Sequence, residues 1–278
     1  MKILIAYDGS ACADAAIEDL RYAGLPAEND LMVVSVAHAQ TPLPQFMKDA
    51  EDAVKLACAQ IRFQFPAWNV WSDVLWGAPA NMLHQTILRY KPELVLVGSH
   101  GRSAVGRLLL GSVSLEVVRD APCSVRVVRL RARKANDHIR LLVATDGSLQ
   151  AMAVVEAVAR RSWPGGTRAH VVSVAEPFEV HVPVLATTLE AGMYASGANF
   201  HHAGVIDGCE CTRLKDVADE SANWLQGRGL AASAAVLEGH PHSEIVAAAK
   251  RWHADTVFVG ARGWALWTAC YWAAFQLP

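Results

Sequence analysis

Short apolar runs alternate with longer amphipathic segments through the first half of the chain. Mainly apolar runs at residues 2–7, 31–37, 69–75, 93–97 and 124–129 predict strands that are buried in a sheet. Between them, apolar residues recur at helical spacing and predict helices after Ser10, over 48–63 and 80–90, and from 113 to 119. This alternation predicts an α/β fold with a doubly wound, Rossmann-like parallel sheet and right-handed crossovers.

The second half of the chain repeats the first. Residues 141–148 repeat the opening strand and turn, and Asp146 takes the place of Asp8. Residues 171–174 repeat residues 33–36 at the same offset, but the offset is larger at the later strand 256–260. The sequence therefore predicts two tandem domains, 1–130 and 139–278, with an insertion near 178–211 in the second.

Glycines follow the strand at 93–97 in an unusual spacing. Gly98 and Gly101 come directly after the strand, and Gly111 with Ser112 precedes the next helix. Glycine lets the backbone approach a ligand closely, and a helix start offers free amide groups that suit a phosphate chain. The spacing is longer than a Walker loop and lacks its Lys-Ser/Thr ending, and it is not the compact glycine fingerprint of dinucleotide folds.

This spacing resembles the ATP-binding signature of the universal stress protein family. The opening segment 2–10, the Gly-Ala-Pro at 77–79 and the closing strand at 121–128 are also similar to that family. The resemblance implies a strand order of 3-2-1-4-5 in each domain, with the first and fourth strands beside the ligand crevice.

The resemblance also implies a site for ATP or ADP, with Mg²⁺ as a further ion that the sequence leaves open. Asp8 would accept hydrogen bonds from the ribose or the adenine, although an Asx-type turn explains the same residue. Val36 would hold the adenine edge through its backbone, and Ser112 and Val113 would contact phosphate. Arg102 is equally compatible with a phosphate contact and a solvated position. The predicted nucleotide-binding residues are Ala6, Tyr7, Asp8, Val36, Val97, Gly98, Gly101, Arg102, Gly111, Ser112 and Val113.

The second copy departs from the family pattern at its end. Asp146, Val174, Gly260 and Gly263 match the first copy, but Ala273 and the following alanine stand where Gly-Ser would fall. The tail 264–278 has no clear helix or strand pattern, and the chain has no counterpart of the strand at 124–129. We therefore expect one nucleotide site, in the first half, and a second sheet that lacks its last strand and has an open edge.

The insertion carries residues that could bind a metal. His201, His202, Cys209 and Cys211 together would suit a tetrahedral zinc site. The Cys-x-Cys spacing is not the common one and the surrounding segment is rich in Gly and Ala, so a mobile loop is the preferred interpretation.

Composition limits the classes of function. The 278 residues are 53% hydrophobic with a net charge of −2, which gives no electrostatic case for nucleic acid or an anionic membrane. The basic stretch 126–134 is predicted to be a solvated linker. The chain begins directly with a strand, and its six cysteines are scattered without disulfide spacing, so we expect a cytoplasmic protein.

Three functions remain open at this point. The first is a nucleotide-dependent regulatory or interaction module of the stress response, as a homodimer or with another protein partner. The second is a slow Mg²⁺-dependent ATPase or phosphotransferase that uses Asp8, although no general base is evident. The third is a nucleotide-free scaffold that docks partners through its aromatic C-terminal tail.

Overall fold

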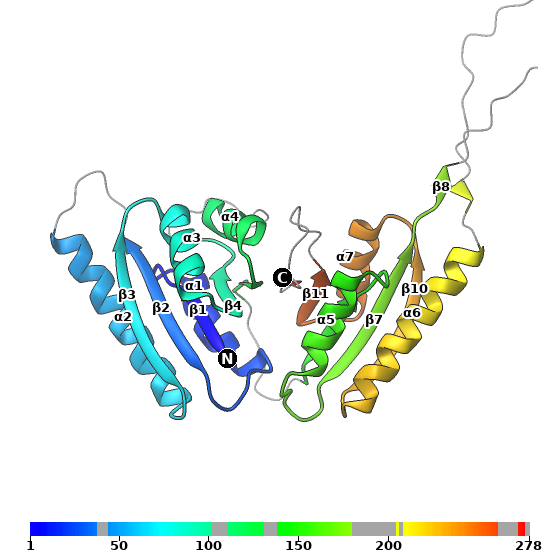
Figure 1. The fold of residues 1–278 in the computed structure, drawn as a ribbon, viewed down its shortest axis with the longest axis horizontal. Coiled ribbons are helices and arrows are strands. Elements are labelled where there is room, and N and C mark those ends of the chain that lie inside the picture. The colour runs from blue at the N-terminus through cyan, green and yellow to red at the C-terminus, as the bar shows by residue number, and fades with distance from the viewer. Residues whose placement is uncertain are drawn as a thin grey trace, which may run out of the picture.

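The computed structural model describes residues 1–37, 44–101, 110–130, 138–179, 204–205, 208–260 and 272–275. Two α/β units lie side by side, one built by each half of the chain (Figure 1).

The first unit has the predicted fold. Its elements are β1 (Lys2–Ala6), α1 (Ala11–Asp19), a 3₁₀ turn (Leu20–Tyr22), β2 (Asp30–Ala37), α2 (Pro44–Gln64), β3 (Asn69–Trp76), α3 (Pro79–Tyr90), β4 (Leu94–Gly98), α4 (Ser112–Asp120) and β5 (Ser124–Val128). The strands are parallel in the order β3-β2-β1-β4-β5, which confirms the order 3-2-1-4-5. Helix α1 begins after Ser10, whose side chain accepts a hydrogen bond from the amide of Ala13, as its type predicts.

The second unit repeats four of these strands. Its elements are β6 (Arg140–Ala144), α5 (Leu149–Ala159), β7 (Arg168–Ala175), β8 (Phe178–Glu179), β9 (Gly204–Val205), α6 (Gly208–Gly227), β10 (Ala231–Glu238), α7 (Pro241–Arg251), β11 (Thr256–Gly260) and β12 (Trp272–Phe275). Strands β10, β7, β6 and β11 are parallel, and the described residues contain no fifth parallel strand in this unit. The predicted loss of the last strand is thereby confirmed.

The predicted open edge is wrong, because the C-terminal tail supplies β12. This strand pairs antiparallel with β11 and parallel with β5. It joins the two units into one sheet of ten strands in the order β10-β7-β6-β11-β12-β5-β4-β1-β2-β3. The tail escaped prediction because its alanines and aromatic residues do not alternate with polar ones.

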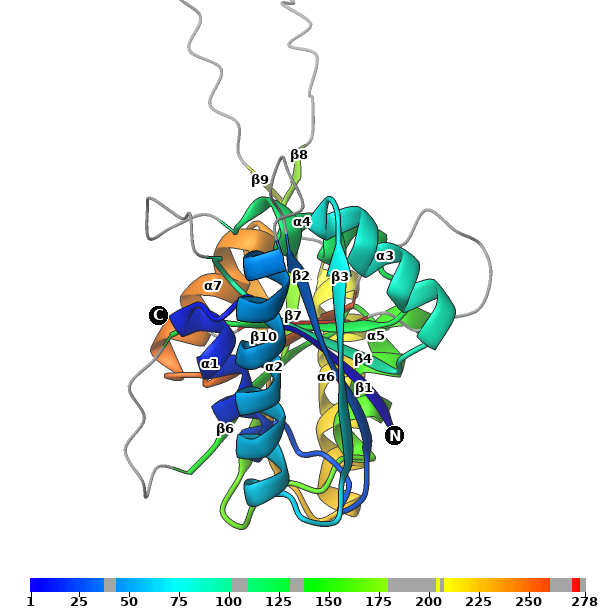
Figure 2. The same ribbon diagram turned by 90° about the vertical axis from the view of Figure 1, so that its left-hand side faces the viewer.

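One hydrophobic core runs through both units on one face of the sheet. It combines buried residues of β1, β2 and β4 with those of β6, β7 and β11, and helices α1, α2, α5 and α6 contribute to the same cluster. On the other face the units have separate clusters, under α3 and α4 in the first and under α7 in the second. Figure 2 shows the helices on the two sides of the strands.

A buried ion pair lies where the units meet. Arg126 of β5 is fully buried, and its guanidinium donates to both carboxylate oxygens of Asp19 in α1. Its Nη2 also lies 3.2 Å from Oγ1 of Thr256 in β11. Arg126 is therefore not part of a solvated linker, as its basic neighbourhood had suggested, while residues 131–137 lie outside the described part of the chain.

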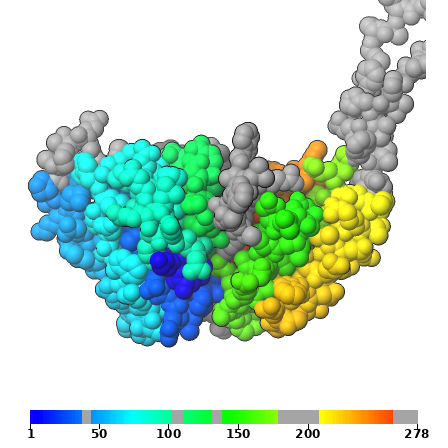
Figure 3. Space-filling model, in the orientation of Figure 1, coloured from blue at the N-terminus to red at the C-terminus, as the bar shows by residue number. Residues whose placement is uncertain are grey.

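The turn after α5 closes the same junction. The backbone amide of Ser162 donates to Gly24 O at 3.0 Å, and Arg161 donates to the carbonyl of Ala23. Trp163 covers Gly24 so closely that a Cβ there would lie 2.9 Å from its ring, and it meets Phe258 edge to face. Burial, then repulsion from Arg126, lowers the pKa of Arg161 to about 9, so this guanidinium is still charged at neutral pH. In Figure 3 the N-terminal residues of the first unit and the α5 region of the second lie side by side.

We predict that Asp19→Ala destabilises the whole chain. The substitution leaves the buried Arg126 guanidinium without its carboxylate, which costs roughly 3–5 kcal/mol in comparable buried pairs. Chemical denaturation should show the loss. The matched control is Glu156→Ala, which breaks an exposed pair with Arg160 and should leave stability nearly unchanged. Equal effects of the two substitutions would contradict the role of the buried pair.

Candidate functional site

The carboxyl ends of β1 and β4 bring most of the predicted nucleotide-binding residues to one edge of the sheet. These strands are neighbours, with Ala6 opposite Val97 in the ladder. The segment from Tyr7 to Ser10 therefore begins beside the segment from Gly98 to Gly101. This is the switch point at which a parallel α/β sheet opens a crevice.

Asp8 and Gly101 come together at this edge. A Cβ on Gly101 would lie only 2.7 Å from Oδ2 of Asp8, so any larger residue here would displace the Asp8 carboxylate. The other oxygen, Oδ1, accepts a hydrogen bond of 2.9 Å from the amide of Ser10. The Asx-type turn considered from the sequence is thus present, and Asp8 lies at the crevice as well.

Gly98 lets β4 approach the start of α1. A Cβ at Gly98 would lie 3.0 Å from the carbonyl carbon of Cys12 and 3.1 Å from the amide nitrogen of Ala13. Both are backbone atoms of a helix, so neither can yield readily. The glycine therefore sets the distance between β4 and α1.

Gly111 places the N-terminus of α4 beside the same loop. Its amide donates to Ser99 O at 2.8 Å, and it is the N-cap residue of the helix that Ser112 and Val113 begin. No side chain caps this end of α4. The amides of the first turn of α4 therefore begin close to Asp8 and Gly101, an arrangement that suits an anionic group.

Polar side chains that the sequence analysis did not assign hold the loop in place. Ser114 in α4 donates to Gly98 O at 2.6 Å, and Ser99 Oγ lies 3.0 Å from His100 Nδ1. Ser10 Oγ donates to the carbonyl oxygen of His100 at 3.3 Å. The sequence does place serines close to the glycine loop, but serine is too common near turns for its presence to predict these contacts. These contacts give His100 a structural role in the loop.

The remaining predicted residues lie around this centre. Val36 lies two residues beyond the β1 partner Val34 on β2, and its partly buried side chain packs against the core cluster under α3 and α4. The Tyr7 hydroxyl donates to Asp14 at 2.7 Å. Arg102 and, in the second copy, Gly263 lie outside the described residues.

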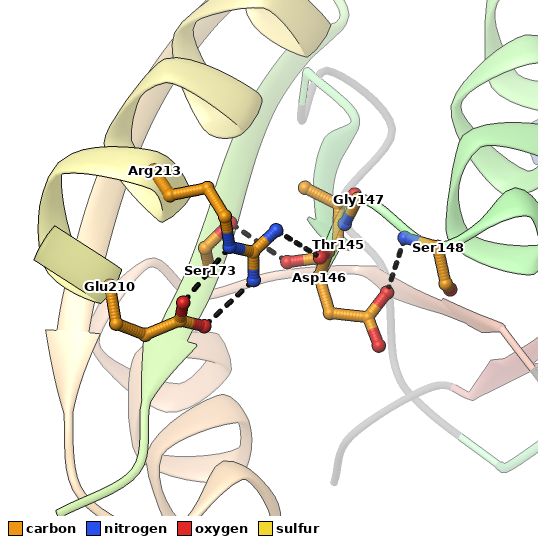
Figure 4. A network of polar contacts seen from close by, with 7 residues as sticks. All are labelled: Thr145, Asp146, Gly147, Ser148, Ser173, Glu210 and Arg213. Carbon is orange, nitrogen blue, oxygen red and sulfur yellow. Dashed lines mark hydrogen bonds and ion pairs between the residues drawn. The ribbon is translucent and has the colours of Figure 1, made fainter.

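The second unit has a pocket at the equivalent edge. Its volume is about 440 Å³, and it lies at the carboxyl ends of β6, β7 and β11. Figure 4 shows a network of polar contacts at this edge, and its residues Thr145, Asp146, Ser148, Glu210 and Arg213 line the pocket. Asp146 Oδ1 accepts from the amide of Ser148 at 2.9 Å, which repeats the contact of Asp8 with Ser10. Glu210 and Arg213 come from α6 and were not foreseen, because the contact with Asp146 spans 67 positions.

The suggested metal ligands are not gathered among the described residues. Cys209 and Cys211 lie in the first turn of α6 and are not in disulfides, so they do not belong to a loop as the sequence had suggested. His201 and His202 lie outside the described residues, and within the described ranges no three His, Cys, Asp or Glu side chains cluster as metal ligands would. None of the described helices combines the length and apolar character needed to cross a bilayer.

The chain belongs to the universal stress protein family. The model of that family matches it twice, at residues 1–129 and 139–268. The chain is therefore a tandem member with two copies of the family unit.

Individual relatives match single copies, and one solved structure matches nearly the whole chain. A universal stress protein of Thermus aquaticus is 34% identical over 136 residues, which is 46% of this chain and 97% of the relative. A Staphylococcus aureus relative is 30% identical over 140 residues, 46% of this chain and 83% of its own length. A universal stress protein structure from Archaeoglobus fulgidus covers 95% of this chain and 86% of its own, with a TM-score of 0.62 and 19% identity, which supports the tandem fold.

We predict that Gly98→Ala destabilises the chain more than the same change at the matching position Gly260. The added methyl at Gly98 meets helix backbone at 3.0 Å, whereas at Gly260 the nearest backbone atom would be 3.3 Å away. Overpacking of this kind costs about 1–3 kcal/mol. Thermal unfolding of the two variants measures the difference. A larger loss for Gly260→Ala would show that Gly98 does not set the spacing.

Proposed function

We propose that the protein binds one adenine nucleotide, ATP or ADP, in its first unit and acts as a nucleotide-dependent regulatory or interaction module in the stress response. The observation that carries the proposal is the convergence of Asp8, the Gly98–Gly101 loop and the N-terminus of α4 at one strand-end crevice. Membership of the universal stress protein family supports it.

Each part of the crevice suits one part of a nucleotide. The amides of Ser112 and Val113 at the start of α4, with the Ser112 hydroxyl, would receive the phosphate chain. The carboxylate of Asp8 would accept hydrogen bonds from the ribose or the adenine, and the backbone of Val36 would meet the adenine edge. Asp8 is the one carboxylate among the proposed binding residues, so a Mg²⁺ ion would be held chiefly by the phosphates themselves.

Binding rather than turnover is the proposed role. Besides Asp8, no proposed binding residue carries a carboxylate or imidazole that could activate a water molecule. The nucleotide would act by favouring the conformation that it binds better, and so change which partner the chain meets. None of the five described cysteines is in a disulfide, which supports the proposed cytoplasmic location.

We predict that Gly101→Ala weakens ATP binding without unfolding the chain. The new methyl would displace the Asp8 carboxylate, and loss of one such polar contact corresponds to roughly a tenfold rise in Kd. Titration calorimetry with ATP gives the affinity and should give one nucleotide per chain. The control is Gly165→Ala, where a Cβ meets nothing within 4 Å. An unchanged Kd for Gly101→Ala would overturn the proposed site.

We predict no sustained ATP hydrolysis. Phosphate release measured with excess ATP and Mg²⁺ should stay at the level of a protein-free control, because the described site offers no evident base. Multiple turnovers that Asp8→Ala abolishes would instead establish the enzyme hypothesis. Turnover that survives Asp8→Ala would show that a contaminant or another site is responsible.

A further inference from the structure

The second unit has a binding pocket that the proposed function does not use. At about 440 Å³ it falls in the size range of sites for small organic molecules. It lies at the strand ends of β6, β7 and β11, where a parallel sheet positions ligands. What it binds can be argued from its lining.

Apolar side chains form part of that lining. Val172 and Val174 come from β7, Leu214 from α6 and Ile245 from α7. Such a lining suits the flat, apolar face of a heterocyclic ring. Val174 occupies the position that Val36 has in the first unit, so both units place a β-branched residue at the same strand end.

The charged side chains of the pocket are mostly acidic. Asp146, Glu176 and Glu210 all line it, and Arg213 is the one cationic residue among its described lining residues. The Arg213 guanidinium already forms two hydrogen bonds to Glu210, at 2.7 and 2.9 Å, and a third to the carbonyl oxygen of Asp146 at 3.4 Å (Figure 4). The described lining therefore has an excess of negative charge, which disfavours a phosphate chain.

The N-terminus of α4, which suits a phosphate group in the first unit, has no counterpart among the described residues of the second unit. Ala273 and Ala274, which stand where Gly111 and Ser112 would be expected, lie in β12 and not at a helix start. Their backbone pairs with β11 and β5. Amides that belong to a sheet ladder are not available to an anion.

We propose that this pocket binds an uncharged nucleoside, without phosphate. The ring would lie against the apolar lining, and ribose hydroxyls would donate to the carboxylate of Asp146 at the strand end, as Asp8 is placed to accept them in the first unit. The inference concerns the other half of the chain from the proposed function and does not rest on it.

The test uses the full chain and three ligands, adenosine, AMP and ATP. Val174→Trp fills the second pocket, and the matched Val36→Trp obstructs the first crevice. In the Val36→Trp protein we expect calorimetry to show one adenosine bound per chain, with AMP and ATP at least about tenfold weaker. Adding Val174→Trp should abolish that adenosine binding, while circular dichroism and the melting temperature report on folding.

Charge is tested separately in the Val36→Trp background. Replacing Glu176 and Glu210 with Gln removes two carboxylates and releases Arg213, which should narrow the preference for adenosine over AMP. The matched control, Asp219→Asn with Glu220→Gln, makes the same charge change on exposed positions of α6 outside the pocket and should leave the preference as it was.

Three results would overturn the inference. They are the absence of adenosine binding to the Val36→Trp protein, adenosine binding that survives the added Val174→Trp, and ATP binding there as tight as adenosine binding. If ATP fails to bind the first unit of the wild-type protein, the adenosine measurements on the second unit can still be interpreted. The two proposals can therefore fail independently.

Discussion

The structure depends on burying one guanidinium at the junction of the two units. Arg126 has no exposed surface, and it is surrounded by Asp19 of α1 and Thr256 of β11. A charge in such a place is tolerated only with a partner that is equally buried, and Asp19 is 4% exposed. Arg126 contacts a helix of one unit and a strand of the other. The pair therefore fixes the relative position of the two units as well as holding them together.

This junction determines how the strands of the two units run relative to each other. β12 runs parallel to β5 but antiparallel to β11, so the strand direction reverses between the units where they meet. In Figure 1, β2 and β7 both end on the upper side.

Local patterns were enough to predict the elements and to bring Asp8 and the glycines to one edge of the sheet. Buried parallel strands leave apolar runs, and Gly98 and Gly101 leave room for the backbone of α1 and for the carboxylate of Asp8. Arg126 was misjudged because its partners stand 107 and 130 positions away, and because a basic stretch follows it from Arg129 onward. The contact of Arg213 with Asp146 escaped for the same reason. Pairings of this kind depend on tertiary packing, which no short window of sequence contains.

The two units use the chain segment that follows their fourth parallel strand in sequence differently. In the first unit the chain after β4 forms a glycine-capped helix, α4, and then a separate strand, β5, which reaches the junction. In the second unit, residues 273 and 274 stand at the place of the helix start, yet they form the strand that joins the sheets. A backbone amide cannot serve the ladder and an anion at once, because it has a single hydrogen to donate. The second unit therefore supplies the connection between the sheets at the expense of the phosphate-binding turn, while its strand-end pocket remains. We therefore expect the two units to differ in the ligands that they bind.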